Sequence, residues 1–157
     1  NLLSKVSQTL KGSFTKSRDV VKHWWQRHFG NHKKSPLEPE LENGSGLSRT
    51  ERISAQSLTE LLRTAAKHPN GDVFANSLSV AGVDGTAANM ARRGVANASL
   101  GQAQLKTGTL RDVASVAGYA TAQSGQRYSV VGIINHPNAP SARAALDALV
   151  EWTVVGH

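Results

Sequence analysis

The sequence has no cysteine, which excludes disulfide bonds and thiolate-bound metal sites. Aromatic residues make up only 5% of its 157 residues, and no apolar run approaches the roughly 18 residues that a membrane-spanning helix needs. The chain does not open with the basic and then apolar segments of a secretory signal peptide. A chain of this length suits a single domain, residues 1–157, with a core of its own.

The net charge of +7 is unevenly distributed along the chain. Residues 1–34 hold eight Lys and Arg against one acid, Asp19, whereas basic and acidic residues balance in the rest. Such a basic face suits either a polyanion or membrane surface nearby, or simply a solvated helical surface. No zinc-finger, RRM or KH pattern accompanies it, so we expect no nucleic-acid partner.

Residues 1–102 are predicted to be mainly helical, because apolar residues recur there at spacings of three and four. Caps are expected at Ser17 and Ser54, and stops at Gly12, Gly30 and Gly94. A Gly-Ser turn, with Leu47 buried at one end, and a loop with short helical pieces separate the helices. The helices are expected at residues 1–11, 18–29, 54–68 and 87–93, the turn at 43–49 and the loop at 79–86.

From residue 103 the pattern changes to the alternation that is typical of strands. Three antiparallel strands are predicted within residues 103–135, and a closing helix within residues 139–154. Helices that cover an antiparallel sheet make an α+β fold. A sheet of three strands is small for this length, so we expect further strands to complete it. The strands are expected at residues 103–109, 113–122 and 127–135.

The first of these strands carries Lys106-Thr107-Gly108, a signature motif of the penicillin-binding and β-lactamase enzymes. Lysine offers a positive charge and threonine a hydroxyl to a substrate carboxylate, while glycine leaves the strand face clear for a peptide. Composition alone predicts about 0.05 such triplets. The alternative is an ordinary lysine at a strand edge.

This chemistry also needs a serine activated by a lysine, as Ser-x-x-Lys at a helix N-terminus, and a Ser-x-Asn element. Ser13-Phe14-Thr15-Lys16 is the only Ser-x-x-Lys, and about 0.8 are expected by chance. We expect it to lie in a loop. Because Ser-x-Asn does not occur, the sequence holds an incomplete site.

Four motifs follow one another along the chain: Asn43-Gly-Ser-Gly-Leu-Ser-Arg49, Ala81-Gly-Val-Asp-Gly-Thr86, Lys106-Thr-Gly-Thr-Leu110 and Ala117-Gly-Tyr119. In this order and spacing they closely resemble the C-terminal part of the class C low-molecular-mass penicillin-binding proteins, the D-alanyl-D-alanine carboxypeptidases/endopeptidases. The resemblance covers essentially the whole chain. One departure is Asn43, where the family usually has Asp, in a turn that we interpret as structural.

The resemblance implies a periplasmic serine enzyme without metal or cofactor. Its serine would attack the D-Ala-D-Ala bond or a peptide cross-link of peptidoglycan, form an acyl-enzyme, and react with β-lactams. Lys106 and Thr107 would bind the terminal carboxylate beside Gly108, and the Thr109 N–H would form half of the oxyanion hole. Asn1 looks like the last residue of the family's Ser-Asp-Asn motif and would contact the substrate amide.

In that family the nucleophile lies far upstream of these motifs. The chain is therefore expected to be a fragment, inactive alone. The partners expected for it are peptidoglycan stem peptides, β-lactams, and either the N-terminal part of the same enzyme, as in a truncated or nicked protein, or a second copy.

Other interpretations stay open at this stage. A non-catalytic module that uses the basic face of residues 1–34 to bind a polyanion or glycan is the main rival. His28 and His32 have a spacing of four but no evident third metal ligand. The Trp24–Trp25 pair suits a core or an interface more than a carbohydrate platform. Ser45 stands between glycines but not in a nucleophile elbow.

Overall fold

The computed structural model describes residues 13–30, 37–94 and 97–156. The chain divides into two compact units, residues 1–57 and residues 58–157. The predicted helix at 1–11 and its stop at Gly12 lie outside the described residues.

The described part of the first unit contains one long helix, α2 (Phe14–Phe29). Its N-cap is Ser13, whose hydroxyl accepts the Lys16 N–H at 3.3 Å. The prediction that Ser17 caps this helix was wrong, and so was the prediction that residues 13–16 form a loop. A backbone in the extended region at Ser13 lets its side chain reach the N3 amide, so the helix begins one turn earlier.

The apolar stripe of α2 is partly confirmed. Trp25 and Phe29 are buried, with 4% and 6% of their surface exposed, whereas Val20 is exposed. Trp24 stacks on the His28 ring, with the ring centroids 4.2 Å apart. The helix ends at Gly30, as predicted, where the Gly30 N–H donates to the Gln26 carbonyl.

The turn at residues 43–49 is organised by polar side chains. The Asn43 side-chain oxygen accepts the Ser45 N–H at 2.9 Å, and the Glu51 carboxylate accepts three successive backbone N–H groups, those of residues 42–44. These bonds satisfy the turn from within, which supports a structural role for Asn43. The prediction that Leu47 is buried was wrong, because 74% of its surface is exposed.

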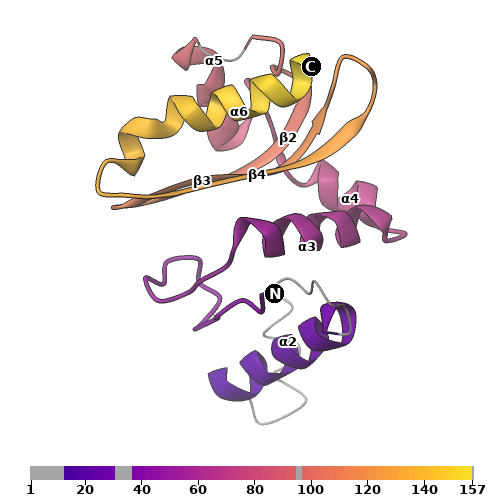
Figure 1. Ribbon diagram of the computed structural model, residues 1–157, viewed down its shortest axis with the longest axis vertical. Coiled ribbons are helices and arrows are strands. Elements are labelled where there is room, and N and C mark those ends of the chain that lie inside the picture. The colour runs from indigo at the N-terminus through magenta and orange to yellow at the C-terminus, as the bar shows by residue number, and fades with distance from the viewer. Residues whose placement is uncertain (1–12, 31–36, 95–96, 157) are drawn as a thin grey trace. The chain divides into compact units, whose positions relative to one another are not determined.

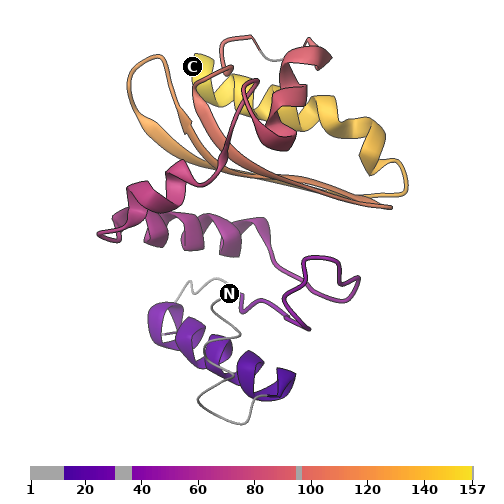
Figure 2. The same ribbon diagram turned by 180° about the vertical axis from the view of Figure 1, so that it is seen from behind.

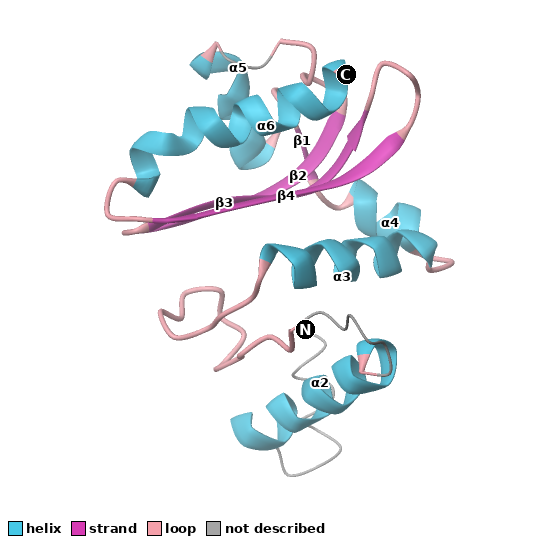
Figure 3. Ribbon diagram, viewed as in Figure 1, coloured by secondary structure: helices cyan, strands magenta, loops and turns pink. Residues whose placement is uncertain are grey.

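The second unit is built on an antiparallel sheet with the strand order β1-β2-β3-β4 (Figure 3). The three predicted strands are confirmed, with ends shifted by one residue at most. The fourth strand, β1, was not predicted, because two residues are too short for a visible alternation. The strands are β1 (Ser79–Val80), β2 (Ala103–Leu110), β3 (Val113–Thr121) and β4 (Arg127–Asn135).

Helices cover both faces of this sheet (Figures 1 and 2). On one face lies α6 (Arg143–Val155), which follows a short 3-10 helix, η2 (Ala139–Ala142), and buries Leu146, Val150 and Val154. On the other face, Leu62 of α3 (Ala55–Lys67) and Ala75 of α4 (Gly71–Asn76) pack around Tyr119. The predicted α+β class and closing helix are confirmed; α4 was not predicted.

The N-terminal cap of α3 is confirmed, because the Ser54 hydroxyl accepts the Ser57 N–H at 3.0 Å.

Between β1 and β2 the chain forms η1 (Gly85–Asn89) and α5 (Met90–Arg93), which ends at Gly94 with φ +69°, as predicted. The Arg93 guanidinium pairs with the buried Asp147 carboxylate and so ties α5 to α6. Glu151 of α6 accepts the Ala98 and Ser99 N–H groups, both at 2.8 Å.

Two glycines let layers of this unit approach closely. A Cβ atom at Gly132 would lie 2.7 Å from a Leu146 methyl group, so α6 can pack this closely against β4 only because residue 132 is glycine. A Cβ atom at Gly118 would lie 2.0 Å from the Gln104 carbonyl oxygen, which belongs to the backbone of the neighbouring strand. Gly118 therefore sets how closely β3 approaches β2 at Leu105, its partner in the register and the residue before Lys106.

The substitution Gly118→Ala is expected to lower the free energy of unfolding by about 2 kcal/mol or more, because the added methyl group has to push the β2 backbone away. Ser129→Ala on β4 removes one atom without adding any and is the control, expected within about 0.5 kcal/mol of the parent. Urea unfolding followed by circular dichroism measures both. Equal unfolding midpoints for the two variants would contradict the close approach.

Candidate active site

The site is built on the edge of β2. The short strand β1 pairs only with Leu105 and Gln104, through Ser79 and Val80. Beyond Leu105, residues 106–110 pair with β3 on one side, and no strand among the described residues pairs with them on the other. An edge of this kind presents backbone N–H and C=O groups that an extended peptide can pair with.

The backbone register decides which groups face that edge. The Ala103 carbonyl accepts the Ala81 N–H at 2.8 Å on the β1 side, whereas the Gln102 carbonyl accepts the Thr121 N–H at 2.9 Å on the β3 side. Backbone direction alternates from one residue to the next along a strand. Thr107 and Thr109 therefore direct their N–H and C=O groups toward the open edge.

Polar groups of Lys106, Thr107 and Thr86 meet at this edge. The exposed Lys106 ammonium donates to the Thr107 carbonyl at 2.6 Å. The Thr107 hydroxyl lies 2.6 Å from the Thr86 hydroxyl of η1. A cation and two hydroxyls thus stand at an edge with which no described strand pairs, an arrangement suited to binding a carboxylate at the end of an extended chain.

Gly108, the next residue of β2, is held by contacts with β3 and α6. A Cβ atom there would lie 2.4 Å from the Ser115 hydroxyl oxygen, the residue opposite it in register. The Gly108 carbonyl accepts a hydrogen bond from the Arg143 guanidinium of α6 at 2.9 Å. The strand is therefore fixed at the site by β3 on one side and by the first residue of α6.

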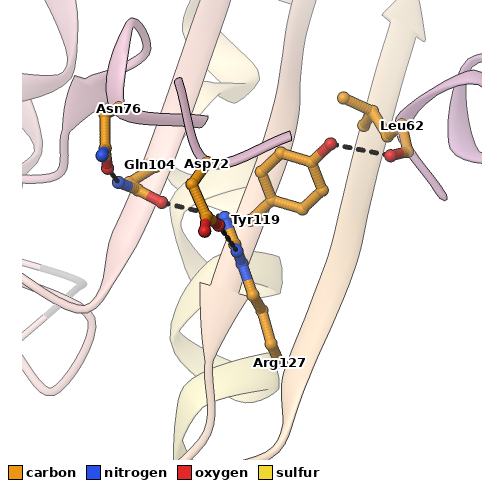
Figure 4. Close-up of polar contacts among 6 residues, drawn as sticks. All are labelled: Leu62, Asp72, Asn76, Gln104, Tyr119 and Arg127. Atoms are coloured by element: carbon orange, nitrogen blue, oxygen red, sulfur yellow. Dashed lines mark hydrogen bonds and ion pairs between the residues drawn. The ribbon is translucent and has the colours of Figure 1, made fainter. Parts of the chain in front are cut away.

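A polar network fixes α3 and α4 to the face of the sheet that carries Gln104 (Figure 4). Gln104 accepts from Arg127 at 3.1 Å and donates to Asn76 of α4 at 2.9 Å, while Arg127 stacks over the Tyr119 ring at 4.4 Å. The Tyr119 hydroxyl donates to the Leu62 carbonyl at 2.7 Å. Burial raises the pKa of Tyr119, against the opposing effect of the Arg127 charge, so the phenol keeps its proton and remains a donor.

The other sequence candidates belong to the first unit or lie outside the described residues. Asn1 and His32 lie outside the described residues. Ser13 and Lys16 open α2 in the other unit, and the Ser13 hydroxyl acts there as a helix cap. Ser45 accepts the Leu47 N–H within its turn.

The His28 ring lies 2.8 Å from the Trp24 carbonyl, and no cluster of three metal-ligating side chains occurs within the described ranges. No helix in the part of the chain that the structure describes is long and apolar enough to cross a membrane.

A family model covers residues 5–154 of the chain, and with them all the residues of this site. The chain belongs to the D-Ala-D-Ala carboxypeptidase 3 (S13) family. It is 35% identical to a D-alanyl-D-alanine carboxypeptidase of Actinomadura sp. (strain R39), over 69% of this chain and 20% of that protein. It is 34% identical to carboxypeptidase DacB of Mycolicibacterium smegmatis, over 69% of this chain and 24% of that protein. The chain thus spans about a fifth to a quarter of the length of these relatives.

Solved structures agree with membership of the S13 family. Penicillin binding protein 4 (dacB) from Haemophilus influenzae, complexed with a β-lactam, matches with a TM-score of 0.68 and 27% identity, over 90% of this chain and 34% of that one. A second structure of the same protein matches with a TM-score of 0.69. The resemblance seen in the four sequence motifs is confirmed at the level of the family and of the fold.

Two residues that contact the candidate strand, Thr86 and Arg143, were not predicted from the sequence. Thr86 ends the motif at 81–86 that carried part of the resemblance, and its place in that motif was a usable signal. Arg143 gave no usable signal in the sequence, because an arginine at the start of a helix is common. Its contact with Gly108 also joins segments that are 35 residues apart in the chain.

Gly108→Ala is expected to lower the free energy of unfolding by about 1 kcal/mol, because the new methyl group displaces the Ser115 hydroxyl. Adding Ser115→Ala removes the clashing oxygen and leaves only the Ser115 Cβ, 3.8 Å away. The double variant is then expected to be more stable than Gly108→Ala alone, a favourable coupling that thermal unfolding of all four proteins measures. If the effects of the two substitutions on stability simply add, the residue 108 methyl group does not clash with the Ser115 hydroxyl.

Proposed function

We propose that this chain supplies the carboxylate-binding strand of a serine D-Ala-D-Ala peptidase. The whole enzyme cleaves the D-Ala-D-Ala bond of peptidoglycan stem peptides, or peptide cross-links, through an acyl-enzyme, and it is acylated by β-lactams. The observation that carries the proposal is the edge of β2, where the Lys106 ammonium and the Thr107 hydroxyl stand at residues with which no described strand pairs on that side. A periplasmic location follows from this substrate.

Each residue of the strand has a role in the proposal. Lys106 and Thr107 bind the terminal carboxylate, by charge and by hydrogen bonding. Gly108 keeps the strand face free of a side chain. The Thr109 N–H, directed to the open edge by the register, is one oxyanion donor, and the N–H of the nucleophile is the other. Asn1 contacts the substrate amide.

The nucleophile is proposed to come from outside this chain. Ser13 is the only serine followed three residues later by a lysine, and its hydroxyl is engaged as the cap of α2. The chain alone is therefore proposed to be inactive, and the rest of the same enzyme is its partner.

The rival function, a polyanion- or glycan-binding module, gains no support from the described part of the basic face. Arg18 donates to the Glu42 carbonyl at 3.0 Å, and the Lys22 ammonium lies 3.7 Å from the Glu38 carboxylate. Two of its cations are thus engaged by the acidic segment that follows α2.

Labelled benzylpenicillin tests where acylation occurs. The whole enzyme is expected to be labelled at a serine outside this chain, and the 157-residue chain is expected to remain unlabelled. Mass spectrometry of the digested protein locates the label. Label on Ser13 that disappears in Ser13→Ala would contradict the proposed source of the nucleophile.

A second experiment tests the carboxylate-binding role. Lys106→Gln in the whole enzyme is expected to lower the rate constant of acylation by benzylpenicillin about 10- to 100-fold, because a hydrogen bond between charged groups is lost. Lys67→Gln, at the exposed end of α3, is the control and is expected to react as the parent does. Stopped-flow measurement of both compares the rates, and an unchanged rate in Lys106→Gln would remove the assigned role.

A further inference from the structure

The hydroxyl groups of Thr86 and Thr107 lie 2.6 Å apart, although the two residues are 21 positions apart in the chain. At this distance one hydroxyl donates its proton to the other. The side chain of Thr107 is half-buried and that of Thr86 is exposed. The contact joins η1 to the open edge of β2, at the residue whose backbone carbonyl accepts from the Lys106 ammonium.

Thr86 is held in place by its own loop and not by Thr107. The Asp84 carboxylate accepts the Val80 N–H at 2.8 Å, and the Asp84 carbonyl accepts the Ala88 N–H at 2.9 Å. Gly85 has a φ of +51°, and a Cβ atom there would lie 2.2 Å from the Ser79 hydroxyl oxygen. Ala87 is fully buried. The loop thus presents the Thr86 hydroxyl at a fixed position next to β2.

The direction of the proton between the two hydroxyls matters for the ligand. A threonine hydroxyl has one proton to donate and two lone pairs that accept. An ionised carboxylate only accepts hydrogen bonds, so Thr107 has to give its single proton to the carboxylate. That is possible only when Thr86 donates to Thr107.

We propose that Thr86 is a positioning residue that selects anionic ligands at this site by donating its proton to Thr107. The inference rests on the proposed function, because it takes the carboxylate of a β-lactam or stem peptide as the ligand. Thr86 holds the Thr107 side chain in one rotamer and leaves its proton directed at the carboxylate. The Thr86 side chain itself does not touch the ligand.

The test compares acylation of the whole enzyme by benzylpenicillin and by its methyl ester, which lacks the anionic carboxylate. Thr86→Val keeps the shape of the side chain and removes the donor. It is expected to lower the acylation rate constant for the free acid about 3- to 10-fold, the usual effect of one hydrogen bond, and to leave the ester rate within about 2-fold. Thr86→Ser keeps the hydroxyl and is expected to react as the parent does.

A double-variant cycle separates this role from a structural one. In a Thr107→Val background, Thr86→Val is expected to have no further effect on the free acid, because the hydroxyl it orients is already absent. Equal losses for acid and ester, or an undiminished loss in the Thr107→Val background, would overturn the proposal. A parent enzyme acylated by neither compound would instead overturn the proposed function and, with it, the role of Thr86.

Discussion

The pairing of β2 with β3 is the constraint on which the candidate site depends. Eight residues of β2 pair in continuous antiparallel register with β3, and at Gly118 the two backbones approach too closely for any side chain. The register then determines which backbone groups and side chains of β2 face the opposite edge. It places the backbone groups of Thr107 and Thr109 outward, and it leaves Lys106 and Gly108 on the other face of the strand from Thr107.

The short strand β1 has two effects on that edge. It pairs with two residues of β2 and then leaves, so that the edge is covered at Gln104 and Leu105 and open from Lys106 onward. The chain that follows it forms η1 and brings Thr86 to Thr107. A longer β1 would occupy the edge where the peptide is proposed to lie. The two-residue length of the strand is therefore part of how the site is made.

The sequence predicted the parts of this fold whose signals are local. Alternation over eight or nine residues marked β2, β3 and β4, and the glycines at 30 and 94 marked helix ends. It failed where structure depends on a single competing contact, as at Ser13, whose cap moved the start of α2, or at Leu47, where carboxylate and amide groups hold the turn instead of an apolar side chain. The triplet at 106–108 was visible as a motif. Its contacts with Thr86 and Arg143 depend on tertiary packing, which no pattern within one segment encodes.

The central claim is that the open edge of β2 binds the carboxylate end of an extended peptide. A crystal structure of the whole enzyme, with its nucleophile replaced by alanine and a peptide ending in D-Ala-D-Ala bound, tests it most directly. The account predicts the terminal carboxylate within about 3 Å of both the Lys106 ammonium and the Thr107 hydroxyl, with the penultimate carbonyl oxygen at the Thr109 N–H. A peptide bound elsewhere, or a strand of the enzyme itself paired along residues 106–110, would contradict it.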